Sequence, residues 1–231
     1  EGTETVLDAG CGSGRATKLV LEKLPSGRVV GIDGSPSMIE VARETFAGEP
    51  RVSLITSDLL ELTPVLLEEQ AGIAAVDAVF SNATFHWIED HRRLFERLHS
   101  VVRPGGRLVA QCGGRDNVSA WCEAILAASE REPFAEYVRG FRPWNFYGPE
   151  ETEERLREVG FEAVRCWLEE MPVVVPDDPL NFISACGLAV HRDRLPEDLR
   201  EPFTEAVIAQ LEVPLELRYV RLNIDARQPG E

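Results

Sequence analysis

Three glycines at alternate positions form the segment of the chain with the clearest chemical meaning. Gly10, Gly12 and Gly14 stand in "VLDAGCGSG", directly after two apolar residues and Asp8. Glycines in such a place let the backbone turn closely around a ligand at the end of a strand. The spacing departs from the dinucleotide fingerprint G-x-G-x-x-G, because Arg15 stands where the third glycine would be. The segment therefore predicts a nucleotide-holding turn other than the phosphate cradle of NAD-binding proteins.

Two further acids follow predicted strands. Asp33 ends the segment "RVVGID" and precedes Gly34, and Asp58 follows "VSLITS" and precedes Leu59. Strand ends of an open α/β sheet meet at one ligand crevice, so we expect these acids to converge there with Asp8. Asp33 can accept from ribose hydroxyls and Asp58 from an adenine amino group, while the Leu59 amide offers a donor to the ring. Three carboxylates around one ligand favour a cofactor that is cationic where NAD is anionic.

Strands and helices alternate through the first half of the chain. Apolar residues at helical spacing run from Arg15 to Leu24, and Ser35 with Pro36 starts a helix that reaches about Phe46. Further strands are predicted at residues 28–33, 52–56, 74–81 and 107–111, with a helix over residues 94–102 before the last of them. Five such units predict an α/β fold, a parallel, doubly wound sheet with right-handed crossovers.

The regular alternation ends beyond Gly114. Residues 118–132 are expected to be helical, "FRPWNFYGP" to be an aromatic loop before a helix rich in Glu, and "GFEAVRCWL" and "LRYVRLNIDA" to be strands. Two helical patterns between these strands predict a cap built onto the sheet. We therefore expect a single domain over residues 1–231, with a cofactor-binding core at 1–114, helices and the aromatic loop at 115–160, the last two strands at 161–168 and 217–227, and a cap insertion at 169–215.

Taken together, these segments resemble a known family. "VLDAGCGSG", the acid of "VVGIDGS", "TSDLLEL", "VDAVFSNATFHWIEDH" and "LHSVVRPGGRLVAQ" are similar to motifs of the class I S-adenosylmethionine-dependent methyltransferases, and within them to the trans-aconitate methyltransferase-like branch. The resemblance is strong over residues 6–112 and looser over "FYGPEETEERLREVGFEAV" and "YVRLNIDA". It implies a Rossmann-like sheet of seven strands, whose last strand is antiparallel and inserted beside the fifth.

The resemblance also implies roles for single residues, with S-adenosylmethionine as the cofactor. Asp8, Gly10 and Gly12, with Gly14, would frame its methionine end, and Asp33 beside Gly34 would hold the ribose. Asp58 with Leu59 would hold the adenine, and Asn82 would lie under the sulfonium side.

The methyl acceptor must lie near the ends of the fourth and fifth strands. Here Asn82 is followed by Ala-Thr-Phe, without the two prolines and the tyrosine of enzymes that methylate amide or exocyclic amino nitrogens. His86 could be a general base, because an unperturbed histidine pKa of about 6.5 suits proton transfer at neutral pH. Alternatively, His86 and Trp87 donate hydrogen bonds to a substrate carboxylate. Arg115 is the first candidate for the positive partner of an anionic substrate, and Arg142 is the second.

Charge and composition limit the partners. The formal net charge of -16 opposes general nucleic-acid binding, and no apolar run approaches the length needed to span a bilayer. Five cysteines without a CxxC pair suit a reducing, cytoplasmic setting. His86 and His91 do not have a recognised zinc spacing, so no metal is expected. The first strand begins close to Glu1 without an initiator Met, so we expect the natural chain to extend upstream; no oligomeric state is indicated.

The sequence thus predicts a methyltransferase that uses S-adenosylmethionine to methylate a small, anionic molecule at a carboxylate oxygen. An alternative within this class is O-, N- or C-methylation of another small metabolite with His86 as the base. Alternatives of other classes are a nicotinamide-dependent oxidoreductase and a cofactor-binding protein without turnover.

Overall fold

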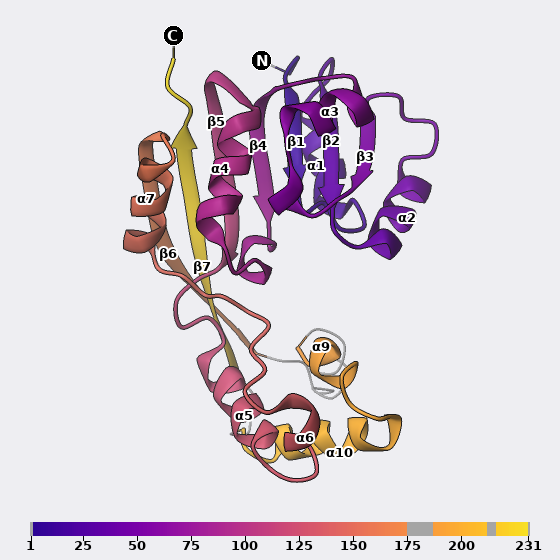
Figure 1. The fold of residues 1–231 in the computed structure, drawn as a ribbon, viewed down its shortest axis with the longest axis vertical. Coiled ribbons are helices and arrows are strands. Elements are labelled where there is room, and N and C mark those ends of the chain that lie inside the picture. Colours follow the sequence, from indigo (N-terminus) through magenta and orange to yellow (C-terminus); the bar gives the residue numbers. More distant parts are fainter. Residues whose placement is uncertain (1, 175–186, 212–215, 231) are drawn as a thin grey trace. The chain divides into compact units, whose positions relative to one another are not determined.

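Seven strands form one sheet in the order β3-β2-β1-β4-β5-β7-β6 (Figure 1). The computed structural model describes residues 2–174, 187–211 and 216–230. The first five strands are parallel, and β7 is antiparallel between β5 and β6, which confirms the predicted doubly wound α/β sheet with its inserted last strand. The strands are β1 (Thr5–Ala9), β2 (Arg28–Asp33), β3 (Val52–Thr56), β4 (Val76–Asn82), β5 (Val102–Gly113), β6 (Glu162–Val174) and β7 (Glu216–Arg227).

The chain divides into two units. Unit 1 consists of Glu1–Gly114, Tyr147–Leu168 and Leu222–Glu231, and unit 2 of Arg115–Phe146 and Glu169–Arg221. Strands β6 and β7 contribute residues to both units. Parts of the predicted cap, residues 175–186 and 212–215, lie outside the described residues.

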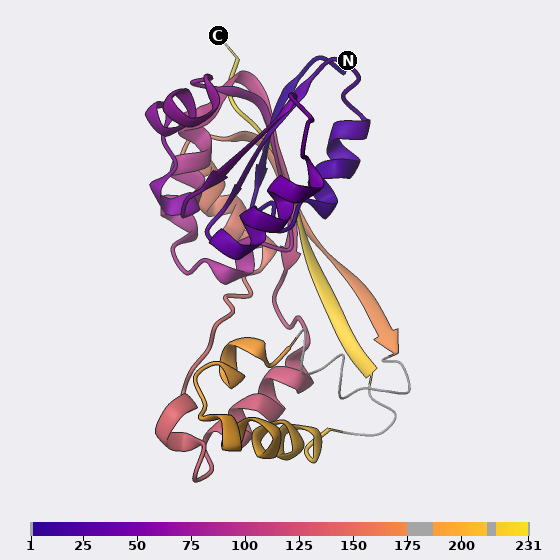
Figure 2. The ribbon, with the colours of Figure 1, turned by 90° about the vertical axis from the view of Figure 1, so that its right-hand side faces the viewer.

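Helices cover both faces of the sheet in unit 1. α1 (Arg15–Glu22) and α2 (Pro36–Thr45) lie on one face, and α3 (Pro64–Ala71), α4 (His91–Val101) and α7 (Pro149–Glu158) lie on the other (Figures 1 and 2). This division follows from right-handed crossovers, because the strand order reverses direction after β3. The apolar face of α4 packs into the core between helices and sheet with all its large side chains fully buried, namely Leu94, Phe95, Leu98 and Val101.

Side-chain caps fix where these helices begin. The N–H of Met38 donates to Ser35 Oγ ahead of α2, and the N–H of Arg93 donates to Asp90 Oδ1 ahead of α4. Such caps satisfy backbone donors that have no partner inside the helix. The loops before α2 and α4 follow the carboxyl ends of β2 and β4.

Two strands are longer than predicted. β5 begins at Val102, because Gly105 N–H donates to the carbonyls of Gln228 and Pro229, and Gln228 N–H donates to Gly106 at 2.9 Å. The segment "RPGG", expected to separate a helix from a strand at 107–111, is therefore itself paired. Likewise β6 continues to Val174, beyond the point where the cap insertion was expected to begin.

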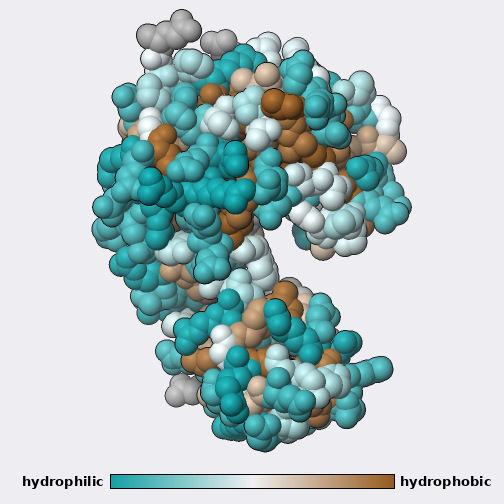
Figure 3. Space-filling model, in the orientation of Figure 1, coloured by the Kyte–Doolittle hydropathy of each residue, from teal (hydrophilic) through white to brown (hydrophobic). Residues whose placement is uncertain are grey.

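Unit 2 has a small apolar cluster of its own. Its helices are α5 (Ser119–Ser129), α6 (Ala135–Val138), α9 (Ala189–Arg192) and α10 (Glu197–Ile208). Trp121 and Ile125 of α5 pack with Phe203 and Val207 of α10, and with Phe134. On the face of the molecule that Figure 3 shows, hydrophilic residues cover most of each unit, in keeping with the high charge.

Candidate functional site

The glycine loop after β1 wraps over the end of β2. Gly10, Gly12 and Gly14 all adopt positive φ, at 83°, 53° and 86°. The N–H groups of Gly10 and Cys11 both donate to the carbonyl of Ile32, at 2.8 and 3.0 Å. Glycine is required most strictly at Gly10, because a Cβ there would lie 2.1 Å from the hydroxyl oxygen of Thr84. A Cβ on Gly12 would meet nothing within 4 Å, so the loop is open at its centre.

Asp8 lies below this loop in a buried position. The residue is 1 % exposed, and the hydroxyl of Thr17 donates to Asp8 Oδ2 at 2.6 Å. Burial raises the pKa of Asp8 from 3.8 to about 6, while the Thr17 hydrogen bond lowers it and the charge of Asp33 raises it. A buried carboxyl of this kind favours a positive charge nearby.

Asp33, the last residue of β2, ties two loops together. Its carboxylate accepts from Gly12 N–H and from Ser35 N–H, both at 2.8 Å. Each carboxylate oxygen can accept more than one hydrogen bond, so ribose hydroxyls can still bind here. The adjacent Gly34 is exposed, with nothing within 4 Å of a Cβ placed on it.

Asp58 and Trp87 line one hollow of unit 1. Asp58 caps the short helix η1 (Leu59–Glu61) by accepting from Leu60 N–H at 2.8 Å, and Leu59 is buried. The hollow has a volume of about 700 Å³, and its other lining residues are Leu60, Ile88, Glu89, Asp90 and Tyr147. The Tyr147 hydroxyl donates to the Glu89 carbonyl at 3.0 Å, which fixes one wall. A hollow of this size can hold a nucleoside.

The turn after β4 is joined to the glycine loop. Asn82 is the exposed last residue of β4, and Ala83 has a positive φ of 58°. Ala83 N–H donates to the Gln111 carbonyl at 2.7 Å, and the Thr84 hydroxyl lies 3.1 Å from the Gly10 carbonyl and 3.2 Å from that of Asn82. Thr84 thereby holds the β4 turn against the loop that carries the three glycines.

His86 accepts a hydrogen bond from the end of β5. The N–H of Gly113 donates to His86 Nδ1 at 3.2 Å, and the ring of His86 lies 5.5 Å from the exposed ring of Trp87. Both residues belong to the short helix η2 (Phe85–Trp87). The contact joins the helix η2 after β4 to the end of β5.

The basic candidates belong to unit 2. Arg115 is exposed just beyond the end of β5, and Arg142 lines a cavity formed by residues of unit 2 alone. Arg221 of β7 also belongs to unit 2, and it lies over the ring of Tyr219, with 4.9 Å between guanidinium and ring centre. The predicted cofactor residues therefore lie in unit 1, as do His86 and Trp87. Arg115 belongs to unit 2.

His91 has a structural environment. It is buried, its Nε2 lies 2.8 Å from the Phe85 carbonyl, and its ring packs 4.5 Å from that of Tyr147. Burial lowers the pKa of His91 to about 4. Among the described residues, no group of three or more His, Cys, Asp or Glu side chains could hold a metal ion.

Sequence reasoning missed the residues that hold the candidates in place. Thr17, Thr84 and Gly113 each bond to a candidate residue or to the glycine loop. Thr17 could have been found, because a helix that begins after Gly14 turns its first residues back towards the strand end. The other two contacts depend on pairing between distant strands, which no local pattern reveals.

These features fit S-adenosylmethionine. The open, left-handed glycine loop leaves room for a close-lying tail, and Asp8 and Asp33 supply acceptors beneath and beside it. Asp58 at a second strand end supplies an acceptor beside the 700 Å³ hollow. This set of carboxylate acceptors suits a ligand with a sulfonium and an ammonium group better than one with a pyrophosphate.

Comparisons with known proteins agree. A profile of the methyltransferase domain matches residues 6–106. The chain is 37% identical to a protein of Escherichia coli named trans-aconitate 2-methyltransferase, over 99% of this chain and 88% of the relative. A protein of the same name from Acidovorax ebreus is 34% identical, over 87% of this chain and 74% of the relative.

A solved structure shares the fold. It is Haemonchus contortus phosphoethanolamine N-methyltransferase 2 in complex with S-adenosyl-L-methionine, with a TM-score of 0.60 at 20% identity. The match covers all of this chain and half of that one. None of the described helices has both the length and the apolar composition needed to cross a membrane.

Membership of this family excludes the alternative of a nicotinamide-dependent oxidoreductase. Its enzymes use S-adenosylmethionine, in line with the residues around the glycine loop. The chain belongs to the class I S-adenosylmethionine-dependent methyltransferases, in their trans-aconitate methyltransferase-like branch.

Proposed function

We propose that this enzyme methylates a carboxylate oxygen of a small organic acid resembling trans-aconitate. The names of the two bacterial relatives support an acceptor of this class. The observation that carries the proposal is the hydrogen bond from Gly113 N–H to His86 Nδ1. A ring nitrogen that accepts a hydrogen bond carries no proton, so a neutral His86 has its proton on Nε2. His86 Nε2 is then a donor, which suits a carboxylate and opposes a role as general base.

A carboxylate acceptor removes the need for a base. Bound S-adenosylmethionine would supply an electrophilic methyl group. Attack of a carboxylate oxygen on the methyl carbon forms the O–CH3 bond of a methyl ester and breaks the S–CH3 bond, so that S-adenosylhomocysteine leaves. Carboxylates are ionised at neutral pH, so no proton must be removed. The task of the protein is then to orient the two reactants and to exclude water, which can contribute roughly 7 to 11 kcal/mol.

The glycine loop and three strand ends would hold the cofactor. The proposed contacts to the methionine end are Asp8, Gly10, Gly12 and Gly14, those to the ribose are Asp33 and Gly34, those to the adenine are Asp58 and Leu59, and Asn82 lies towards the sulfonium. Asp33 has a double task, because its carboxylate also fixes the loop through Gly12 N–H.

His86 and Trp87 would orient the acceptor. The Nε2–H of His86 and the indole N–H of Trp87 are donors that a carboxylate can use, and Trp87 is 46% exposed. A chain with a net charge of -16 must provide a local positive charge for an anion, and Arg115 is proposed for that part.

A labelled-methyl assay with trans-aconitate as the probe tests the proposal. We expect kcat to be independent of pH between 6.5 and 8.5, because no residue must lose a proton. His86→Gln, which keeps an amide donor, should retain activity within about tenfold, whereas His86→Ala should raise KM by about ten- to a hundredfold through loss of a charge-assisted hydrogen bond.

The alternative acceptors predict a different result. If His86 were the base for a hydroxyl, nitrogen or carbon acceptor, kcat would rise about tenfold per pH unit up to the histidine pKa, and His86→Gln would be as inactive as His86→Ala. Arg115→Gln, with exposed Arg131→Gln as the matched control, tests the positive partner through KM for the acid. Binding of S-adenosylmethionine without transfer to any acid would contradict the catalytic proposal.

A further inference from the structure

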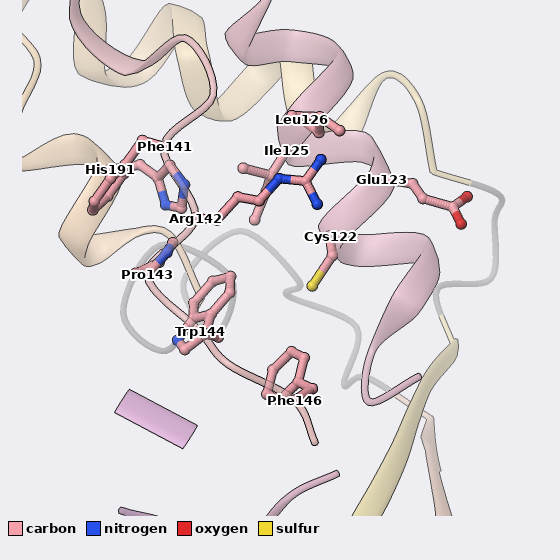
Figure 4. A pocket seen from close by; sticks show the side chains of 10 residues that line it. All are labelled: Cys122, Glu123, Ile125, Leu126, Phe141, Arg142, Pro143, Trp144, Phe146 and His191. Carbon is pink, nitrogen blue, oxygen red and sulfur yellow. The ribbon is translucent and has the colours of Figure 1, made fainter. Parts of the chain in front are cut away.

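Unit 2 contains a cavity that the proposed methyl transfer does not use. Its volume is about 190 Å³, and it lies between α5, α9 and the aromatic loop (Figure 4). The lining residues are Cys122, Glu123, Ile125 and Leu126 of α5, Phe141, Arg142, Pro143, Trp144 and Phe146 of the loop, and His191 of α9. All ten belong to unit 2.

Aromatic packing builds one wall of this cavity. The ring of His191 lies 5.0 Å from that of Phe141 and 5.8 Å from that of Trp144, and the Arg194 guanidinium lies 3.8 Å from the centre of the Phe141 ring. Trp144 in turn is stacked near Phe146, with 6.2 Å between ring centres. These contacts give the loop a fixed path, so the cavity is bounded by packed rings and the apolar side of α5.

Two polar groups face this otherwise apolar space. Arg142 extends across the cavity towards α5, and Figure 4 shows the Glu123 carboxylate pointing away from it. Burial raises the pKa of the Cys122 thiol to about 11, and the positive charge of Arg142 lowers it by a smaller amount. The charge of Arg142 is therefore felt by a side chain that lines the cavity. Arg142 is the single cationic side chain among the ten lining residues.

His191 is the second polar group. It is completely buried, and its ring lies beside the backbone carbonyl of Phe141. Burial lowers the pKa of His191 to about 4, against the smaller effect of the Phe141 carbonyl, which raises it. His191 is therefore neutral and adds no second positive charge to the wall of the cavity.

We propose that this cavity binds a small monocarboxylate whose body is an apolar ring, with the carboxylate at Arg142 and the ring against Ile125 and Trp144. An apolar cavity of about 150 Å³ is known to hold benzene, so 190 Å³ leaves room for a ring and one small substituent. The single positive charge of Arg142 can pair with one ligand carboxylate, and the negative charge of Glu123 at the edge would repel a second carboxylate. The proposal goes beyond the methylation of a small polar acid, because it concerns a ligand held by unit 2 alone.

Calorimetric titration of the full chain with benzoate tests this proposal, with S-adenosylhomocysteine present throughout. We expect saturable binding of benzoate, and a loss of about tenfold or more in affinity in Arg142→Gln, because a charge-assisted hydrogen bond is removed. Benzyl alcohol, with the same ring and no charge, should bind more weakly and be insensitive to this change. Arg131→Gln, an exposed arginine elsewhere in unit 2, should bind benzoate as the unchanged protein does.

Filling the cavity tests the location. Leu126→Trp should abolish benzoate binding and leave the affinity for S-adenosylhomocysteine unchanged, which shows that unit 1 remains folded. Benzoate affinity that is equal in Arg142→Gln and the unchanged protein, benzyl alcohol binding as tight as that of benzoate, or no saturation at millimolar benzoate would each overturn the proposal.

Discussion

Replacement of Asp8 by Asn should stabilise the ligand-free protein at neutral and alkaline pH. Asp8 is buried, and its pKa is raised from 3.8 to about 6. Because the folded-state pKa lies above the unfolded value, the folded protein binds more protons between pH 4 and 6, and the free energy of unfolding falls as pH rises through that window. At 1.36 kcal/mol per pKa unit, ionised Asp8 lowers the free energy of unfolding by about 3 kcal/mol above pH 6. Asn cannot ionise, and its amide oxygen can still accept from Thr17.

Urea unfolding followed by circular dichroism at several pH values measures this effect. We expect the free energy of unfolding of Asp8→Asn to exceed that of the unchanged protein by up to about 3 kcal/mol at pH 8. The difference should be only about 1 kcal/mol at pH 4.5, where Asp8 is protonated in the folded state. Asp193→Asn, an exposed aspartate, should change stability by less than about 0.5 kcal/mol at any pH. Equal stability of Asp8→Asn and the unchanged protein at pH 8, or a gain that does not vary with pH, would refute the reasoning.

Three further predictions concern the cofactor loop. The positive charge at the methionine end of the cofactor, near Asp8, should lower the pKa of Asp8, so affinity for S-adenosylmethionine should rise by about tenfold from pH 5 to 7 in calorimetric titrations and be flat in Asp8→Asn. Asp33→Ala should weaken binding of S-adenosylhomocysteine by roughly 1 to 3 kcal/mol through loss of charge-assisted bonds, and unchanged affinity would rule out its role. Gly12→Ala should cost about 1 to 2 kcal/mol from left-handed strain alone, whereas Gly10→Ala should cost more because its Cβ would meet Thr84; equal melting temperatures would contradict this.

The positions of the cofactor candidates were predictable because they depend on strand ends. Asp33 and Asn82 are each the last residue of a strand, and Asp58 is the second residue after one, so a count of strands was enough to bring them to one edge of the sheet. The place of the antiparallel last strand beside the fifth came from the family resemblance, since apolar runs alone do not specify which strands pair.

The acceptor side was less predictable for a physical reason. Contact between His86 and Gly113 depends on the register of β4 against β5, and this register shifts between Val76 and Ala78. A shift of one residue turns every later side chain to the other face, and the sequence carries no local signal for it. The start of β5 was missed similarly, because Gly105 pairs with residues more than a hundred positions away.

Unit 2 is made of two separate stretches of sequence, and the chain crosses between the units four times. It leaves unit 1 after Gly114 and Leu168 and returns at Tyr147 and Leu222. No single truncation can remove unit 2, and no single cassette can transplant it between relatives. Its apolar cluster joins Trp121 of the first stretch to Phe203 of the second, so a chimaera must exchange residues 115–146 and 169–221 together to keep matched packing.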